Sequence, residues 1–484
     1  MGSVEDEADE PVTPAGRLFV RPEMNQVIHC AVGLKNPLDV DSIKSQVRSS
    51  VMLRHPRFCS LMVRDSNGRE HWRRTHIDVD RHILALDRPV STTQKDDDSA
   101  VNEYLADLST SSGLSYDKPL WEIHLLLAHK CVIFRIHHAL GDGVSLMSML
   151  LACCREEDDV NALPRIGNLE NRRNSVGGNE RGWCEWLHYY WSVLWGFVGM
   201  VLFSLVFAVE FALRGLWVCD RKTAIAGGAG VELWPRKLGT ARFVLEDMKA
   251  VKKAVPNANL HLHRAMLRGK KGCNLACTIF VLRDVISLQV ISSNEVTIND
   301  VLFGVISSGL SRYLDYRGPN ALEEGIQLTG VAMVNLRQQP GLQDLSDLMK
   351  DNSGSRWGNK FGMVLLPVYY HKSGADPLKY LERAKFAGLL NYRIICNTSF
   401  TISNVVGPKE KITIGGNPIT YMRVNSSSLP HALTMHMVSY AGRADMQILV
   451  AKDIIPDPDY LAKCFEDALH EMKAAAAATN KKSR

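Results

Sequence analysis

The sequence lacks several features that would place it in a common class of protein. Its N-terminus, Met1–Glu10, is acidic and has no apolar h-region, so it does not resemble a secretory signal. Position 6 is Asp6, whereas a myristoylation signal that begins at Gly2 has Ser or Thr there. The formal charge of +5 is small and dispersed. It gives no nucleic-acid-binding footprint and at most a modest attraction to an anionic membrane surface.

The cysteines provide no disulfide framework. There are eleven, an odd number without regular spacing. Cys30, Cys131 and Cys464 lie in apolar runs, where cysteine usually acts as a small buried hydrophobic residue. This pattern predicts a reducing, cytosol-facing setting for the globular parts.

A metal site is also not indicated. Cys273 and Cys277 lie near His261 and His263, but their spacing matches no zinc pattern, so we expect no metal.

A chain of 484 residues with 46% hydrophobic and 23% charged residues is globular and too long for one core of ordinary size. We therefore expect an α/β fold of two lobes. The expected division is an N-terminal lobe at 11–157, a linker at 158–233 with a hydrophobic segment at 188–218, and a C-terminal lobe at 234–472.

Periodicity predicts elements in both lobes. In the first lobe we expect a hairpin turn at Asn67-Gly68 and a helix with Asp41 as its N-cap. The other expected elements are helices at 41–53, 144–154, 299–314 and 377–390, and strands at 123–128, 131–136, 328–334 and 362–370. Asn257–Glu295 fits neither lobe and is interpreted as an insertion, such as an unspliced intron would produce.

Trp191–Val209 is a charge-free apolar run, flanked by aromatic residues before it and basic residues after it. A helix that crosses a bilayer needs about 20 such residues, so a membrane-associated segment is favoured over a buried core helix.

His137-His138-Ala139-Leu140-Gly141-Asp142-Gly143 directly follows the strand expected at 131–136. An imidazole with a pKa near neutrality can accept a proton from a hydroxyl and later return it. Adjacent side chains of an extended segment point to opposite faces, so the two histidines should not bind one zinc ion. Most histidines have no chemical role, and a purely structural pair remains the alternative.

These residues resemble the HHxxxDG signature of the coenzyme-A-dependent acyltransferase superfamily. Further blocks occur in order and are similar to those of plant bifunctional wax ester synthase/diacylglycerol acyltransferases. They are Pro11–Phe19, PLWE at 119–122, Asn299-Asp300-Val301, VNLR at 334–337, GNKFG at 358–362 and SNVVGP at 403–408. The resemblance covers nearly the whole chain except Asn257–Glu295 and the polar linker.

The resemblance implies a two-lobed fold like that of chloramphenicol acetyltransferase, with a tunnel between the lobes. It implies that His138 is the general base, supported by His137, and that acyl transfer is direct, without an acyl-enzyme. Asp142 would be structural, Gly143 would give space, and Asn299 would assist near the oxyanion or cap its helix. No cofactor is implied. Acyl-CoA would be the co-substrate, and long-chain fatty alcohol or diacylglycerol the acceptor.

A single membrane crossing would place the two lobes on opposite sides, so we expect a re-entrant or shallow anchor with both lobes cytosolic. The endoplasmic reticulum membrane is the expected location, with the plasma membrane as a second one. Two alternatives stay open. One is a soluble acyltransferase for other alcohols, although the DFGWG block of that group is absent from the sequence. The other is an inactive lipid-binding relative.

Overall fold

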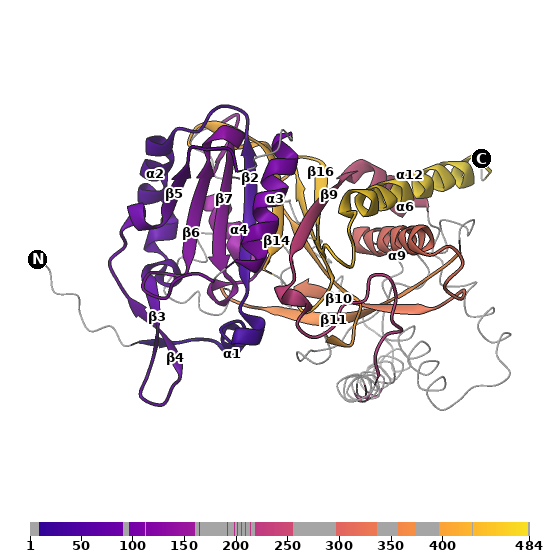
Figure 1. Cartoon of the computed structure of the whole chain (residues 1–484). Helices are drawn as coiled ribbons and strands as arrows, with labels where there is room; N and C mark the ends of the chain where they lie inside the picture. Colours follow the sequence, from indigo (N-terminus) through magenta and orange to yellow (C-terminus); the bar gives the residue numbers. More distant parts are fainter. Residues whose placement is uncertain are drawn as a thin grey trace, which may run out of the picture.

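A computed structural model of the chain describes residues 9–90, 96–111, 113–159, 218–254, 297–335, 357–372, 396–427 and 429–482, with isolated positions between 164 and 213. Two lobes stand side by side, each built on one β-sheet (Figure 1). This confirms the expected two-lobed α/β architecture.

The sheet of the first lobe has seven strands and is covered by helices on both faces. Alternate residues of its central strands pack against different helices: Val32 lies in the core with α4 (Gly143–Ala152), and Ala31 lies in the core with α3 (Asp97–Thr110). A strand covered on both faces needs apolar residues throughout, which explains the continuous apolar runs. The strand order is β5 (Ile83–Leu86), β6 (Trp121–Leu126), β7 (Cys131–His137), β2 (Val27–Leu34), β14 (Asn417–Ser426), β13 (Ile412–Ile414) and β8 (Arg155–Glu156).

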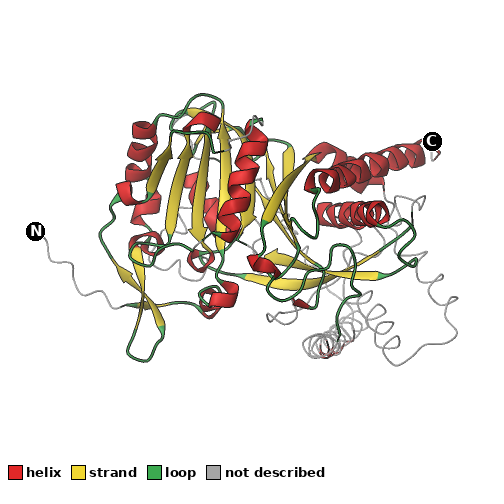
Figure 2. Ribbon diagram, viewed as in Figure 1, coloured by secondary structure: helices red, strands yellow, loops and turns green. Residues whose placement is uncertain are grey.

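The sheet of the second lobe has six strands, and its helices gather on one face (Figures 1 and 2). These helices are α6 (Leu245–Ala254), α9 (Ile298–Arg317) and α12 (Pro458–Lys482). They enclose the core of this lobe together with one face of the sheet. The strand order is β11 (Phe361–Tyr369), β10 (Gln327–Asn335), β12 (Phe400–Val406), β15 (Leu433–Tyr440), β16 (Arg443–Ala451) and β9 (Arg236–Val244).

The two lobes are not separated along the sequence, because β13 and β14 come from the second half of the chain and complete the sheet of the first. β14 pairs with β2, with Arg423 opposite Ala31. The buried Arg423 side chain donates to Asp445 on β16 at 3.1 Å and to both carboxylate oxygens of Asp98 on α3 at 3.1 and 2.9 Å. A desolvated guanidinium with carboxylates on both sides holds the lobes together at this junction.

A small three-stranded sheet, β1 (Glu10–Pro11), β4 (Glu70–Arg74) and β3 (Ser60–Arg64), lies beside the first lobe. Its hairpin turns at Asn67-Gly68, where Gly68 adopts φ 75°, as the sequence predicts. The strands expected at 123–128 and 131–136 form the neighbouring pair β6 and β7, also as predicted.

The helix expected at 41–53 was predicted wrongly at both ends, because it stops at Ser49 and a separate 3-10 helix, Val51–Arg54, follows. The helix α2 (Val40–Ser49) is capped by Asp39, not Asp41, because the Asp39 side chain accepts from the backbone N–H groups of Asp41 and Ser42. Both aspartates could cap a helix, and only the extended backbone at Asp39 selects between them.

Three predictions fall largely or wholly outside the described residues: the hydrophobic segment at 188–218, the insertion at 257–295 and the helix at 377–390. Among the residues that the structure does describe, no helix has both the length and the apolar character needed to cross a membrane.

Candidate active site

The candidate site forms where β7 ends and the chain turns into α4. β7 ends at His137, and His138 begins a short 3-10 helix, η6 (His138–Leu140). Backbone hydrogen bonds hold both residues: His137 N–H donates to Leu120 O at 3.0 Å, and His138 N–H donates to Gln26 O at 2.8 Å. The imidazoles are therefore supported by regular secondary structure, as a precise site requires.

The His138 ring is oriented by Asn359, which lies two residues before β11 in the second lobe. The Asn359 Nδ2 group donates to His138 O at 2.8 Å, so its Oδ1 atom faces His138 Nδ1, at 3.0 Å. A carbonyl oxygen only accepts, so His138 Nδ1 carries the proton and His138 Nε2 has a free lone pair. This is the tautomer that a general base requires.

Two aromatic rings pack on the same imidazole. Phe19 stacks on His138 with ring centroids 4.0 Å apart, and Phe361 lies at 5.6 Å in a tilted arrangement. Burial lowers the pKa of His138 below its ordinary value, although the nearby Asp142 and the Asn359 hydrogen bond act in the opposite direction. The lowered pKa thus favours the uncharged ring, while the residue remains partly exposed.

His137 points away from this position and is fully engaged. Its Nδ1 accepts from the Ala139 backbone N–H at 3.1 Å, which leaves the proton on Nε2, and Nε2 donates to Asn25 Oδ1 at 2.8 Å. Burial lowers the pKa of His137 to about 3, with a further contribution from His138. These contacts stabilise the turn and leave no nitrogen for chemistry.

Asp142 connects the turn to the second lobe. Its side chain caps α4 by accepting from Ser145 N–H at 3.0 Å, and its other oxygen accepts from Lys360 N–H at 2.8 Å. Ser145 Oγ lies 3.2 Å from both the O and the N of Gly358. Together these bonds fix Asn359, which lies between Gly358 and Lys360, against His138.

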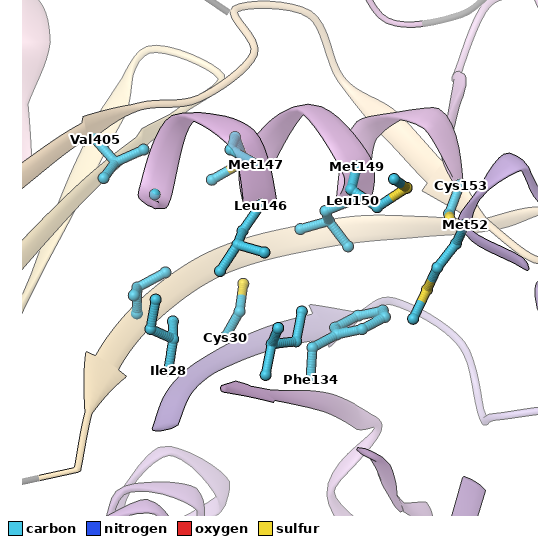
Figure 3. A pocket seen from close by; sticks show the side chains of 13 residues that line it. Ile28, Cys30, Met52, Phe134, Leu146, Met147, Met149, Leu150, Cys153 and Val405 are labelled. Atoms are coloured by element: carbon cyan, nitrogen blue, oxygen red, sulfur yellow. The ribbon is translucent and has the colours of Figure 1, made fainter. Parts of the chain in front are cut away.

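An apolar cavity begins near this turn and runs beneath α4, between the helix and strands β2, β7 and β14 (Figure 3). Val405 lies at one end, beside the start of α4, and Met52 and Cys153 lie at the other. A Cβ atom on Gly143 would lie 2.9 Å from Val405 Cγ2, so glycine leaves space at this end. The complete lining is Ile28, Cys30, Met52, Phe134, Ile136, Gly143, Leu146, Met147, Met149, Leu150, Cys153, Val405 and Val424.

Asn299 lies in the first turn of α9, which is capped by Thr297 and Asp300 in a reciprocal capping box. Its Oδ1 accepts from Asn404 Nδ2 at 2.8 Å. Asn404 pairs with Met437, and Met437 packs in the core beneath α9. The described contacts of Asn299 are therefore on the helix-covered face of the second sheet, and its role near an oxyanion stays a prediction.

Sequence reasoning gave no role to Asn359, Phe19 or Phe361, although each belongs to a block that was matched. Their position within those blocks was the only signal. These residues lie between 119 and 223 positions from His138 along the chain, and only the fold brings them into contact with it. Within the described residues, no three histidine, cysteine or acidic side chains converge as metal ligands.

Two family models match the chain. The wax ester synthase/diacylglycerol acyltransferase catalytic domain matches residues 45–257, and the WS/DGAT C-terminal domain matches residues 384–473. The first match contains both histidines and the second contains the Ser403–Pro408 block.

Named relatives match over almost the entire chain. Wax ester synthase/diacylglycerol acyltransferase 5 of Arabidopsis thaliana is 32% identical, with 97% of this chain and 94% of that protein covered. Wax ester synthase/diacylglycerol acyltransferase 11 of the same plant is 30% identical, with 96% and 95% covered.

Solved structures share the fold at low identity. A wax ester synthase/diacylglycerol acyltransferase from Marinobacter aquaeolei VT8 has a TM-score of 0.55 and 16% identity, with 96% of this chain and all of that chain covered. The first condensation domain of the CDA synthetase has a TM-score of 0.55 and 13% identity, with 98% and 97% covered. Because the Arabidopsis relatives are at least 30% identical over almost the entire chain, the chain belongs to the wax ester synthase/diacylglycerol acyltransferase family and is an acyltransferase.

Proposed function

We propose that the chain transfers a fatty acyl group from acyl-CoA to a long-chain fatty alcohol, forming a wax ester, and also to diacylglycerol, forming triacylglycerol. The observation that supports this most strongly is the His138 imidazole, whose pKa is lowered by burial. Asn359 holds its Nδ1, and no described residue hydrogen-bonds to its Nε2. Acyl-CoA and the acceptor alcohol are the substrate types that the family name implies.

In the proposed reaction, His138 Nε2 takes the hydroxyl proton of the acceptor as its oxygen attacks the thioester carbon. The resulting tetrahedral oxyanion collapses, the carbon–sulfur bond breaks, and the coenzyme A thiolate receives the proton from His138. Asn359 keeps the ring in the basic tautomer throughout. The transfer is direct and needs no acyl-enzyme.

We assign the cavity beneath α4 to one alkyl chain of the substrates. Its lining is entirely apolar or sulfur-containing, and Gly143 at one end lies five residues after His138. Each methylene moved from water into such a cavity contributes about 0.8 kcal/mol, so the part of the chain that enters it adds to the binding free energy.

The cavity assignment is tested by filling its two ends separately. Cys153→Phe at the end far from Val405 should shift the preference toward shorter chains and leave short-chain turnover unchanged. Gly143→Ala at the other end should lower turnover for every chain length. If both variants changed turnover equally for all chain lengths, the assignment of the cavity to substrate binding would be contradicted.

We further propose that the enzyme works at the cytosolic face of the endoplasmic reticulum membrane, anchored by the hydrophobic segment at 188–218. Strands β2 and β14 lie on either side of this segment in the sequence yet pair in one sheet. This pairing supports the proposal that both lobes lie on the same side of the membrane and that the anchor is re-entrant or shallow. Protease protection of tagged lobes in sealed microsomes tests this, and one luminal lobe would contradict it.

The activity is tested with labelled palmitoyl-CoA and three acceptors: hexadecanol, a diacylglycerol and an aromatic alcohol. We expect ester formation with the first two, lowered by about 10³-fold in the His138→Ala variant. Turnover only with the aromatic alcohol would favour an acyltransferase for other alcohols. Lipid binding without turnover of any acceptor would favour an inactive relative.

A further inference from the structure

A second histidine of the described fold lies on the face of the second sheet that is turned toward His138. On β15, Met435 and Met437 belong to the core beneath α9 and α12, whereas Val438 belongs to the core of the first lobe. Side chains alternate along a strand, so His436 shares the face of Val438. It therefore projects toward the first lobe, away from the helices.

Its strand neighbours place it beside the cavity. In the parallel pairing of β12 and β15, His436 lies next to Ser403, and Val405 follows two residues later on the same face. Val405 lines the cavity and faces Gly143. His436 is also close enough to His138 for the charges of the two rings to interact. One imidazole from each lobe thus borders the same region.

The nitrogen atoms of His436 suit a ligand-binding role. Nδ1 is buried and has no hydrogen-bond partner among the described residues, while the residue as a whole is partly exposed. Burial, with a smaller contribution from His138, lowers the pKa of His436 to about 4. The ring is therefore neutral at physiological pH and retains one N–H group that can donate.

Among the described residues, His431 before β15 and His29 on β2 lie nearby, and both are shielded from solvent. His431 is hydrogen-bonded through both nitrogens, to Thr398 at 2.9 Å and Thr401 at 2.7 Å. His29 is fully buried and contacts Asn425 at 3.1 Å. His436 differs from both because it is partly exposed.

We propose that His436 is a second catalytic imidazole, whose N–H group donates a hydrogen bond to the acyl-CoA carbonyl oxygen as that oxygen becomes an oxyanion. This rests on the proposed acyl transfer. The acceptor proton goes to His138, the new carbon–oxygen bond forms as the carbonyl electrons move to oxygen, and the carbon–sulfur bond breaks on collapse. His436 transfers no proton. A neutral imidazole is suited to this task because it donates without first losing or gaining charge.

The kinetic test compares His436→Leu, His436→Gln and the control His29→Gln. Loss of an oxyanion donor typically lowers kcat about 100-fold or more. We therefore expect kcat to fall by this factor in His436→Leu, with little change in the KM for the alcohol. His436→Gln keeps an N–H donor and should retain a higher kcat than His436→Leu. The rising limb of the pH profile should keep its position, because His138 remains the base. A loss of kcat below threefold in His436→Leu, or a loss in His29→Gln as large as that in His436→Leu, would overturn the proposal.

A binding test separates this proposal from the proposed function, because it needs no turnover. Two unreactive acyl-CoA analogues are compared: a ketone, in which CH₂ replaces the sulfur and the carbonyl remains, and a thioether without the carbonyl. The wild-type chain should favour the ketone by roughly tenfold, the value of one hydrogen bond. His436→Leu should bind both analogues equally. Undiminished discrimination in His436→Leu would overturn the proposal even if no ester were ever formed.

Discussion

His137 and His138 are consecutive residues of one motif, yet the fold gives them opposite environments. His137 holds its proton on Nε2 and uses both nitrogens in contacts with Asn25 and Ala139. His138 holds its proton on Nδ1, against Asn359 from the other lobe, and its Nε2 has no hydrogen-bond partner in the described part of the chain. The tautomer of each ring follows from its neighbours, so the same amino acid becomes a structural element in one case and a candidate base in the other.

The difference arises from which lobe supplies the partner. The contacts of His137 lie within the first lobe, so they form whenever that lobe folds. The partner of His138 comes from residues 357–360, which Asp142 and Ser145 fix in place. The basic tautomer therefore depends on the two lobes being assembled.

The largest contrast should appear when each histidine is replaced by alanine. His138→Ala is expected to lower kcat by about 10³-fold, within the usual range for loss of a general base. Its free energy of unfolding should fall by about 1–2 kcal/mol, because the substitution leaves Asn359 Oδ1 without its donor and removes the ring that stacks on Phe19. Turnover and chemical unfolding are measured on the same preparation. Wild-type turnover in His138→Ala would show that His138 is not the general base.

Asn359→Leu should have the next largest effect on turnover. Without the Oδ1 acceptor the ring can adopt either tautomer, and kcat should fall by about 10²-fold. The matched control is Ser145→Ala. It removes the contacts of Ser145 with Gly358, next to Asn359, without changing the contacts of the His138 ring, and it should lower kcat by less than about tenfold. If both variants were equally impaired, the role of Asn359 would be structural only.

The pH profile tests the charge state of His138. Its pKa is below the usual value of about 6.5, and only the neutral ring is a base. The ratio kcat/KM should therefore rise with pH along a limb below about 6.5 and then level off. Asn359→Asp would stabilise the imidazolium, raise this pKa and move the limb to higher pH. A limb that stays in place in Asn359→Asp would contradict the assignment.

His137→Ala should have the smallest effect on turnover and the clearest effect on stability. It leaves the Asn25 side chain and the Ala139 N–H without their partner, at a cost of about 1–3 kcal/mol. Turnover at a temperature where the variant is folded should stay within about tenfold of the wild type. A far larger loss of turnover with unchanged stability would make His137 a participant in the reaction.

Sequence alone predicted the parts of the fold that depend on local patterns. Apolar runs identified β6 and β7, and the helical period identified α9. The HHALGDG motif indicated the position of the site. The crossing of β14 and the contact between Asn359 and His138 could not be predicted, because both join residues far apart in the chain. The choice between Asp39 and Asp41 as helix cap was missed because it depends on one backbone torsion.

The position of β14 has a consequence for how the protein is made. β2 is synthesised early, but its partner on one side, residues 417–426, leaves the ribosome only when most of the chain has been translated. Until then the nascent first lobe exposes an unpaired strand edge, which is prone to pair with other chains. Production of this protein should therefore depend more on chaperones during translation than the stability of the finished fold would suggest.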